Sequence, residues 1–279
     1  MKREIYQEKT ERAWSKLCDR LDRDGLLSEP NRKPHTAKIV MWAAAAAAVV
    51  ALFIVSTPRT VPKHEAVADN LISQRNDDRG TVLIKTLEDN STVYMTGNSV
   101  LECPSRFSDK ERKVNLDGEA LFDVTHQQRH PFVIDTKGMS IQVLGTCFNV
   151  KCGSRGDFEL DVFRGRVKVT DKKNGGMEVV SAGEMVRLEN NRLNRYKLVD
   201  DRNLRKYNSN MRFKDEKLCN IVKAINTINV DKEIKVADVV RNRRLTVAFA
   251  NDNPQTMAML LGEALHLKCI EEGNVITIK

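Results

Sequence analysis

Residues 114–124 read VNLDGEALFDV and show the pattern that decides the fold of the largest region of this chain. Apolar side chains stand at alternate positions and polar or charged ones stand between them, which is typical of a β-strand with one face in a core. The apolar positions are Val114, Leu116, Ala120, Phe122 and Val124. The same alternation returns in the pairs Phe132 and Ile134, Leu160 and Val162, and Val167 and Val169.

Turn-forming residues separate these alternating segments and complete the pattern of an all-β domain over residues 80–195. Between Ile141 and Val150 the buried parity switches around Gly145-Thr146, which predicts a bend or bulge there. The expected turns are Asp89-Asn90, Gly97-Asn98, Asp117-Gly118, Lys137-Gly138, Arg164-Gly165 and Asn174-Gly175-Gly176.

Residues 207–279 follow a different rhythm and predict a small α+β domain made of two strand–helix–strand halves. Residues 215–228 place Leu218, Ile221, Val222 and Ile225 on one helical face. A second helix begins at Asn253-Pro254, with proline at its first position. Its apolar positions are Met257, Leu260, Leu261, Ala264 and Leu265. The expected strands are 245–249, 267–270 and 275–278, the last two forming a hairpin.

One apolar segment predicts a single membrane span. Residues 39–57 read IVMWAAAAAAVVALFIVST and contain no charged residue, glycine or proline. A helix of this length spans ~28 Å, close to the ~30 Å hydrocarbon core of a bilayer. A buried helix and a cleaved signal peptide are the alternatives, but the segment begins after 38 residues, which favours a signal anchor. Residues 58–79 are polar and read as a linker.

The flanking charges predict the orientation of this span. The twenty residues before it carry five Lys or Arg residues and the twenty after it carry three. Positive charge is retained on the cytoplasmic side of a membrane. We therefore expect an inner-membrane, single-pass protein with residues 1–38 in the cytoplasm and the C-terminus in the periplasm.

The 38-residue tail contains a stripe that needs a partner. Trp14, Leu17, Cys18 and Leu21 are spaced to lie on one face of a helix, and Gly25 is a plausible end for it. An isolated helix of this length is marginal in water. The stripe therefore predicts contact either with the bilayer surface or with a protein partner.

Several sequence motifs resemble the FecR family over residues 80–190. They are residues 87–95 (LEDNSTVYM), 98–104 (NSVLECP), 114–124 (VNLDGEALFDV), 130–136 (HPFVIDT) and 139–151 (MSIQVLGTCFNVK). Residues 211–279 resemble the secretin/TonB short N-terminal-type domain that follows the FecR domain in the Bacteroidetes branch.

This resemblance implies a transmembrane anti-sigma factor. In such proteins a cytoplasmic segment binds an extracytoplasmic-function sigma factor, and the periplasmic part senses the signalling domain of an outer-membrane TonB-dependent transporter. On this reading Trp14, Leu17 and Leu21 are the candidate sigma-binding residues. The family's sigma-binding region is usually longer than the tail of this chain.

The C-terminal domain offers a candidate surface for the periplasmic partner. Sheet edges can pair with an incoming strand. We expect the strand around Leu245, Val247 and Phe249, or the final hairpin, to contact the transporter's signalling domain. A glycan- or peptidoglycan-binding protein of the envelope is the alternative function, which would require a row of exposed aromatic side chains.

Nothing in the sequence points to catalysis, a cofactor or a metal site. No phosphate-binding loop, nucleophile elbow or HExxH motif occurs. His126 and His130 lack further ligands nearby, which makes a poor zinc site. Cys147 and Cys152 are five apart, on opposite faces of any strand, and read as packing thiols rather than a disulfide.

The net charge of +8 does not indicate direct nucleic-acid binding. Basic and acidic residues are interleaved along the chain, so no segment presents a face of one sign. The run Arg241-Asn242-Arg243-Arg244 is the exception. It reads as a solvated loop, with a phosphate- or lipid-facing patch as the alternative.

Overall fold

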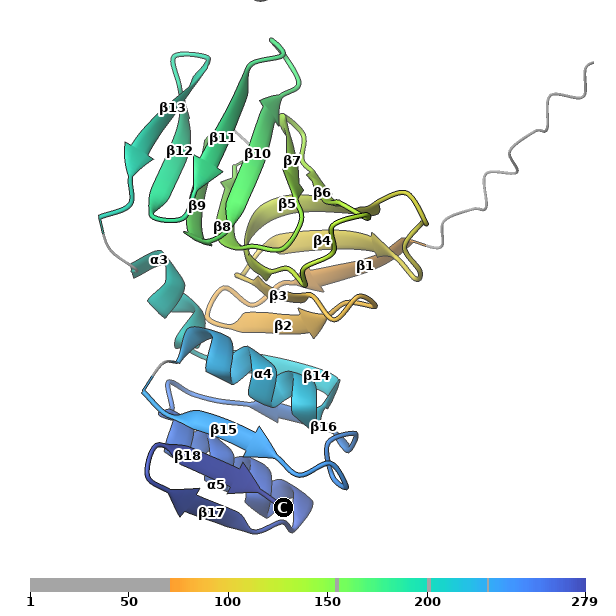
Figure 1. Cartoon of the computed structure of the whole chain (residues 1–279), viewed down its shortest axis with the longest axis vertical. Coiled ribbons are helices and arrows are strands. Elements are labelled where there is room, and N and C mark those ends of the chain that lie inside the picture. Colours follow the sequence, from red (N-terminus) through yellow and green to blue (C-terminus); the bar gives the residue numbers. More distant parts are fainter. Residues whose placement is uncertain (1–70, 154–155, 200–201, 230) are drawn as a thin grey trace, which may run out of the picture. The chain divides into compact units, whose positions relative to one another are not determined.

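The computed structural model describes residues 71–153, 156–199, 202–229 and 231–279 (Figure 1). All of them belong to one unit, Ala66–Lys279. About half of the described chain is β-strand, and the strands fall into three groups. The expected all-β region and the C-terminal strand–helix–strand halves are both present.

The first group is a sheet in the order β1-β4-β5-β6-β7-β10-β11, antiparallel except for the parallel pair β5–β6. β1 occupies part of the range expected to be linker. The strands are β1 (Leu71–Asn76), β4 (Ser99–Pro104), β5 (Arg112–Asp123), β6 (Phe132–Asp135), β7 (Met139–Val143), β10 (Arg166–Asp171) and β11 (Met177–Ser181).

The second group is a sheet in the order β13-β12-β9-β8-β5-β3-β2-β14-β16. Its last two strands come from the C-terminal region. The strands besides β5 are β2 (Val82–Thr86), β3 (Thr92–Met95), β8 (Cys147–Cys152), β9 (Phe158–Arg164), β12 (Glu184–Glu189), β13 (Arg192–Lys197), β14 (Met211–Lys217) and β16 (Arg244–Ala248).

Strand β5 belongs to both sheets and bends between them (Figure 1). Its first half pairs with β4 and β6, and its second half, from Gly118 onward, pairs with β3 and β8. Gly118 has φ +105°, and a Cβ there would lie 2.8 Å from the Cα of Ser99. The turn expected at Asp117-Gly118 is therefore wrong, because glycine here bends one long strand instead of ending it.

The other turn signals hold. Asn90 and Asn98 adopt left-handed conformations, each with φ 63°, between β2 and β3 and between β3 and β4. Gly165, with φ 85°, turns the chain between β9 and β10. The parity switch at Gly145-Thr146 is also confirmed, because these residues carry the chain from β7 in the first sheet to β8 in the second.

The main core lies between the two sheets and is built from the alternating residues that the sequence pattern singled out. Phe122 stacks on Phe148 with ring centroids 5.6 Å apart, and Phe132 meets Phe122 edge-on at 6.2 Å. Side chains of both sheets are fully buried in it. They include Val93, Leu101, Phe122, Phe132, Ile134, Ile141, Phe148, Val150, Leu160, Val162, Val167, Val169 and Val186.

The C-terminal region adds two helices and a third sheet in the order β15-β18-β17. Helix α5 starts at Pro254, and the side chain of Asn253 caps it by accepting from the Thr256 N–H at 2.8 Å. The elements are α3 (Arg202–Arg205), η1 (Lys206–Asn208), α4 (Leu218–Ile228), β15 (Glu233–Val236), α5 (Pro254–Leu265), β17 (Cys269–Glu272) and β18 (Val275–Ile278).

Two details of this region refine the expectation. Helix α4 begins at Leu218 rather than 215, because β14 continues to Lys217, which pairs with Arg244. On α5, Leu260 is one of the expected apolar positions and is 39% exposed. The buried face is centred on Ala258, Leu261 and Gly262, where Gly262 packs against Leu267 and Cys269.

A second core joins the C-terminal region to the outer face of the second sheet. Tyr94 of β3 is fully buried in it, and its hydroxyl donates to the carbonyl of Ala224 in α4 at 2.9 Å. Strand β14 also pairs in parallel with β2, matching Met211 to Val82. The first and second sheets, which form a sandwich around the main core, are therefore linked to the C-terminal region by both backbone pairing and packing.

Candidate functional site

The expected sigma-binding residues Trp14, Leu17 and Leu21 and the expected span at 39–57 lie outside the described residues. In the part of the chain that is described, no helix has the length and hydrophobicity needed to cross a bilayer. The described residues do include the expected partner-binding edge, which lies in the C-terminal region around β14 and β16.

Strand β16 is the last strand of the second sheet and pairs only with β14 among the described strands. The sequence placed the partner-binding edge here. The side chains of Leu245 and Val247 are half-buried and pack against the second core. Phe249 is 1% exposed and meets Phe213 edge-on at 6.2 Å. These three side chains therefore hold the edge in place, and what the edge offers a partner is backbone.

The pairing pattern identifies which backbone groups face outward. The N–H of Phe249 donates to the carbonyl of Met211 at 2.8 Å, and Val247 stands opposite Phe213. Antiparallel strands alternate between residues bonded to the partner strand and residues turned away from it. The backbone groups of Ala248, between these two residues, therefore point to the open side of the edge.

Asp215 and Arg244 fasten the far end of β16. Asp215 sits at an irregularity in β14, with φ 46°, and its N–H donates to the Thr246 hydroxyl at 2.9 Å. Its carboxylate accepts from Arg244 Nε at 2.8 Å and Nη2 at 2.9 Å. The hydrogen bonds from Arg244 lower the pKa of Asp215, while exposure to solvent limits what this pair contributes to stability.

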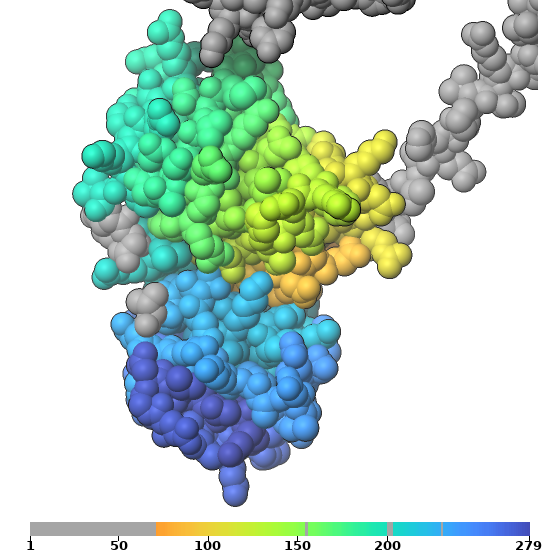
Figure 2. Space-filling view, viewed as in Figure 1, coloured from red at the N-terminus to blue at the C-terminus, as the bar shows by residue number. Residues whose placement is uncertain are grey.

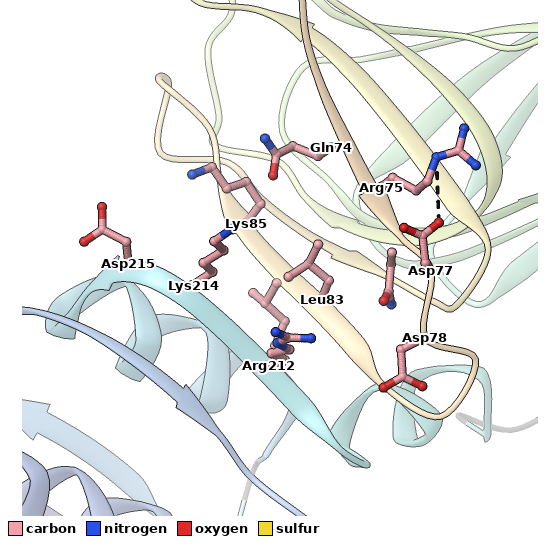
Figure 3. A pocket seen from close by; sticks show the side chains of 11 residues that line it. Gln74, Arg75, Asp77, Asp78, Leu83, Lys85, Arg212, Lys214 and Asp215 are labelled. Carbon is pink, nitrogen blue, oxygen red and sulfur yellow. Dashed lines mark ion pairs between the residues drawn. The ribbon is translucent and has the colours of Figure 1, made fainter.

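Beside this edge lies a groove of about 480 Å³, shown in Figure 3. It is walled by the end strand of the first sheet, β1, and floored by β2 and β14 of the second sheet. We call it the cationic groove. Its lining includes Gln74 and Arg75 of β1, Leu83 and Lys85 of β2, and Arg212 and Lys214 of β14.

Three cations on the floor of the groove make no ion pair or hydrogen bond with any described residue: Lys85, Arg212 and Lys214. Two of the three carboxylates in the lining are ion-paired, and the third, Asp78, accepts from the Gly80 N–H at 2.9 Å. Asp77 lies 3.8 Å from Arg75, and the Asp215 carboxylate is held by Arg244. The free charge on the floor of the groove is thus positive.

Each arginine of the basic run at residues 241–244 has a partner within the fold. Arg241 pairs with Asp238 at 3.3 Å, and Arg243 donates to the carbonyl of Leu265 at 2.9 Å. Arg244 is held by Asp215. The guanidinium groups of Arg241 and Arg243 contact the segment before β16 and the end of α5, and that of Arg244 joins β16 to β14.

Polar contacts at the junction hold the groove's floor to the sandwich. Tyr207 donates to Asn149 Oδ1 at 2.6 Å, and Asn203 Nδ2 donates to Asp161 Oδ2 at 2.6 Å. Lys206 pairs with Glu119. Burial raises the pKa of Asp161 and raises that of Tyr207 well above its usual value. These groups position the C-terminal region and are not open to a ligand.

The thiols behave as packing groups. All five described cysteines are free. Burial raises the pKa of Cys147 to about 12 and that of Cys152 to about 11, which keeps both thiols protonated and unreactive at neutral pH. No group of three metal-ligating side chains occurs among the residues that the structure describes.

The groove was not predicted from the sequence. The signal for its floor was present in Met211-Arg212-Phe213-Lys214, where buried and exposed residues alternate as in a strand. The sequence pattern did not reveal which strand lies beside β14, because its partner β2 comes about 130 residues earlier in the chain.

Comparison with known proteins places part of the chain in a family. Residues 79–168 match the family described as FecR protein. A search of curated proteins found none that matches the chain. Two crystal structures of a candidate anti-sigma factor from Parabacteroides distasonis ATCC 8503, at 2.50 and 1.65 Å resolution, are similar to it. Each shares 18% identity at a TM-score of 0.47 and covers 75% of this chain and 98% of the solved one. The chain therefore carries a FecR domain over residues 79–168, which confirms the FecR resemblance seen in its sequence motifs.

Proposed function

We propose that this protein is a transmembrane anti-sigma factor that regulates an extracytoplasmic-function sigma factor. The observation that carries the proposal is the FecR domain at residues 79–168, preceded by an uncharged 19-residue segment and a 38-residue tail. The tail would lie in the cytoplasm and hold the sigma factor. The segment at 39–57 would cross the inner membrane, and the FecR domain and the C-terminal region would lie in the periplasm. The crystal structures from Parabacteroides distasonis carry the name of the same class.

The tail is the part of this proposal that mutation tests best. Trp14→Ala and Leu17→Ala each remove an anchor from the apolar stripe, and loss of a buried Trp anchor typically costs about 2 kcal/mol or more of binding. We expect both variants to release the sigma factor and raise transcription of its regulon. Transcription is measured with a promoter reporter, and Lys16→Ala, off the stripe, is the matched control.

A second readout separates a protein partner from a bilayer partner. Both variants should remain in the membrane after carbonate extraction, because the segment at 39–57 is unchanged. Unchanged transcription in both variants would show that the stripe contacts the bilayer and not a sigma factor. Loss of the wild-type chain from the membrane fraction would remove the span from the proposal.

The periplasmic partner we propose is the signalling domain of an outer-membrane TonB-dependent transporter, bound along β16. The support is geometric: β16 ends its sheet, and the backbone of Ala248 faces away from β14. Partners that add a strand gain affinity from main-chain hydrogen bonds. The half-buried Leu245 and Val247 and the buried Phe249 would keep that edge rigid.

Proline at position 248 tests this edge. Ala248→Pro removes an outward N–H while sparing the bonds to β14, so we expect about tenfold weaker binding, the loss of roughly one hydrogen bond. Ala248→Val keeps the N–H and is the control. Binding of the signalling domain to the full chain is measured by calorimetry, and equal affinity for both variants would rule out pairing at β16. Proline at Val247 would instead break the ladder with β14.

The alternative, an envelope glycan- or peptidoglycan-binding protein, lacks a specific feature in its favour. Glycan-binding faces commonly present aromatic rings to the sugar. In the described part of the chain, Tyr196 is the one exposed aromatic side chain.

A further inference from the structure

The cationic groove combines features that its role in the fold does not explain. Lys85 and Lys214 lie one residue beyond Ile84 and Phe213, the last matched pair of the β2–β14 ladder. Figure 3 shows both side chains on the floor of the groove, with Arg212 further along β14. Like charges on neighbouring strands are destabilising. Lys85 is close enough to Asp215 to help lower its pKa, but that carboxylate is hydrogen-bonded to Arg244, so neither lysine has a hydrogen-bonded anion among the described residues.

The wall of the groove, strand β1, also has backbone groups without a partner strand. Strand β1 ends the first sheet and pairs only with β4 among the described strands, so one side of its backbone is unpaired there. Leu71 and Ile72 on this strand are 52% and 44% exposed. Natural proteins usually protect an edge strand with charges, proline or a covering segment. These two side chains lie outside the lining of the groove, and it is the open backbone of β1 that can pair with another chain.

We propose that the cationic groove binds an acidic, extended segment of a partner protein, which adds as a strand to β1. Its main chain pairs with the open edge of β1, and its carboxylates lie over Lys85, Lys214 and Arg212. The charge of the floor selects acidic side chains, and the free edge selects an extended backbone. This inference rests on the groove alone and does not depend on the sigma-factor assignment or on pairing at β16.

A designed peptide serves as the probe. The full chain, solubilised in detergent, is titrated into a labelled peptide of about twelve residues that alternates glutamate and valine, and binding is followed by fluorescence anisotropy. Two further peptides of the same length accompany it: one alternates lysine and valine, and one carries a central proline in the glutamate–valine sequence. We expect the uninterrupted acidic peptide to bind tightest of the three.

Charge reversal in the groove should weaken this binding about tenfold, as expected for the loss of two partly exposed charge pairs. The variant is Lys85→Glu with Lys214→Glu. Its matched control is Lys168→Glu with Lys197→Glu, which changes the net charge equally at exposed lysines outside the groove. Circular dichroism checks that each variant folds. If the reversed pair does not fold, Lys85→Met with Lys214→Met removes the charge without introducing a new one.

The outcomes divide cleanly. Weaker binding by the groove variant alone, together with weaker binding of the proline-interrupted peptide, supports strand addition in the groove. Equal affinity of the wild type and the groove variant would overturn the proposal. So would equal binding of the two acidic peptides, or displacement by low-millimolar inorganic phosphate, because either result means that the groove binds anions without reading a backbone.

Discussion

Replacing Arg112 with methionine is expected to lower the free energy of unfolding by about 3–5 kcal/mol, the usual cost of breaking a buried ion pair from one side. Arg112 is 2% exposed, and its Nη1 lies 2.6 Å from Asp89 Oδ2. It also donates to the carbonyls of His130 and Thr125, each at 2.9 Å. The substitution takes the counter-ion from the buried Asp89 carboxylate, which keeps only its hydrogen bonds from Ser91. It also leaves three backbone carbonyls without this donor, those of His130, Thr125 and Leu144. Urea unfolding followed by circular dichroism measures the change.

An exposed ion pair provides the control for this prediction. Arg187 lies 2.9 Å from Glu159, with its side chain 47% exposed. Exposed pairs contribute about 0–1 kcal/mol, so Arg187→Met should cost little. The double variant Arg112→Met with Asp89→Asn should recover part of the loss, because it removes the stranded charge. If Arg112→Met costs no more than Arg187→Met, the buried cluster does not stabilise the fold as described.

The substitution Gly118→Ala is expected to cost about 2–4 kcal/mol, combining backbone strain with overpacking. Gly118 has φ +105°, and an added Cβ would lie 2.8 Å from Ser99 Cα and 2.7 Å from its Oγ. Both sheets depend on the bend that this residue allows in β5. Thermal and urea unfolding of the full chain measure the loss.

Gly138 is the matched glycine. It lies in the turn between β6 and β7, and a Cβ there would meet no atom within 4 Å. We expect Gly138→Ala to change stability by less than about 0.5 kcal/mol. Equal effects of the two substitutions would contradict the account of β5 as one strand bent at glycine.

These two glycines also show what the sequence could and could not predict. Lys137-Gly138 and Asp117-Gly118 are similar local signals, and only the first one ends a strand. The difference lies in the pairing of β5 with β4, β6, β3 and β8, which sequence periodicity does not reveal. Alternation identified the core correctly, because burial on one face of a strand is a local property.

In the candidate site, too, some features could be predicted from the local sequence and others could not. The edge strand at residues 244–248 was predictable from its own alternation. The orientation of its backbone was not, since it depends on which residues pair with β14. The cationic groove was still less predictable, because Lys85 and Lys214 come together only through a parallel pairing between distant strands. Long-range register is the information that a single sequence does not express.

The measurement that tests the central claim most directly uses the tail alone. A peptide of residues 1–38 is immobilised and mixed with each extracytoplasmic-function sigma factor of the source bacterium, and retained protein is identified. We predict that one sigma factor is retained by the wild-type peptide and lost when Trp14 and Leu17 are both alanine. Deletion of residues 2–30 from the chain should then change transcription from the promoters of that sigma factor. Retention of no sigma factor by the wild-type peptide, together with unchanged transcription in the deletion strain, would contradict the assignment of this protein as an anti-sigma factor.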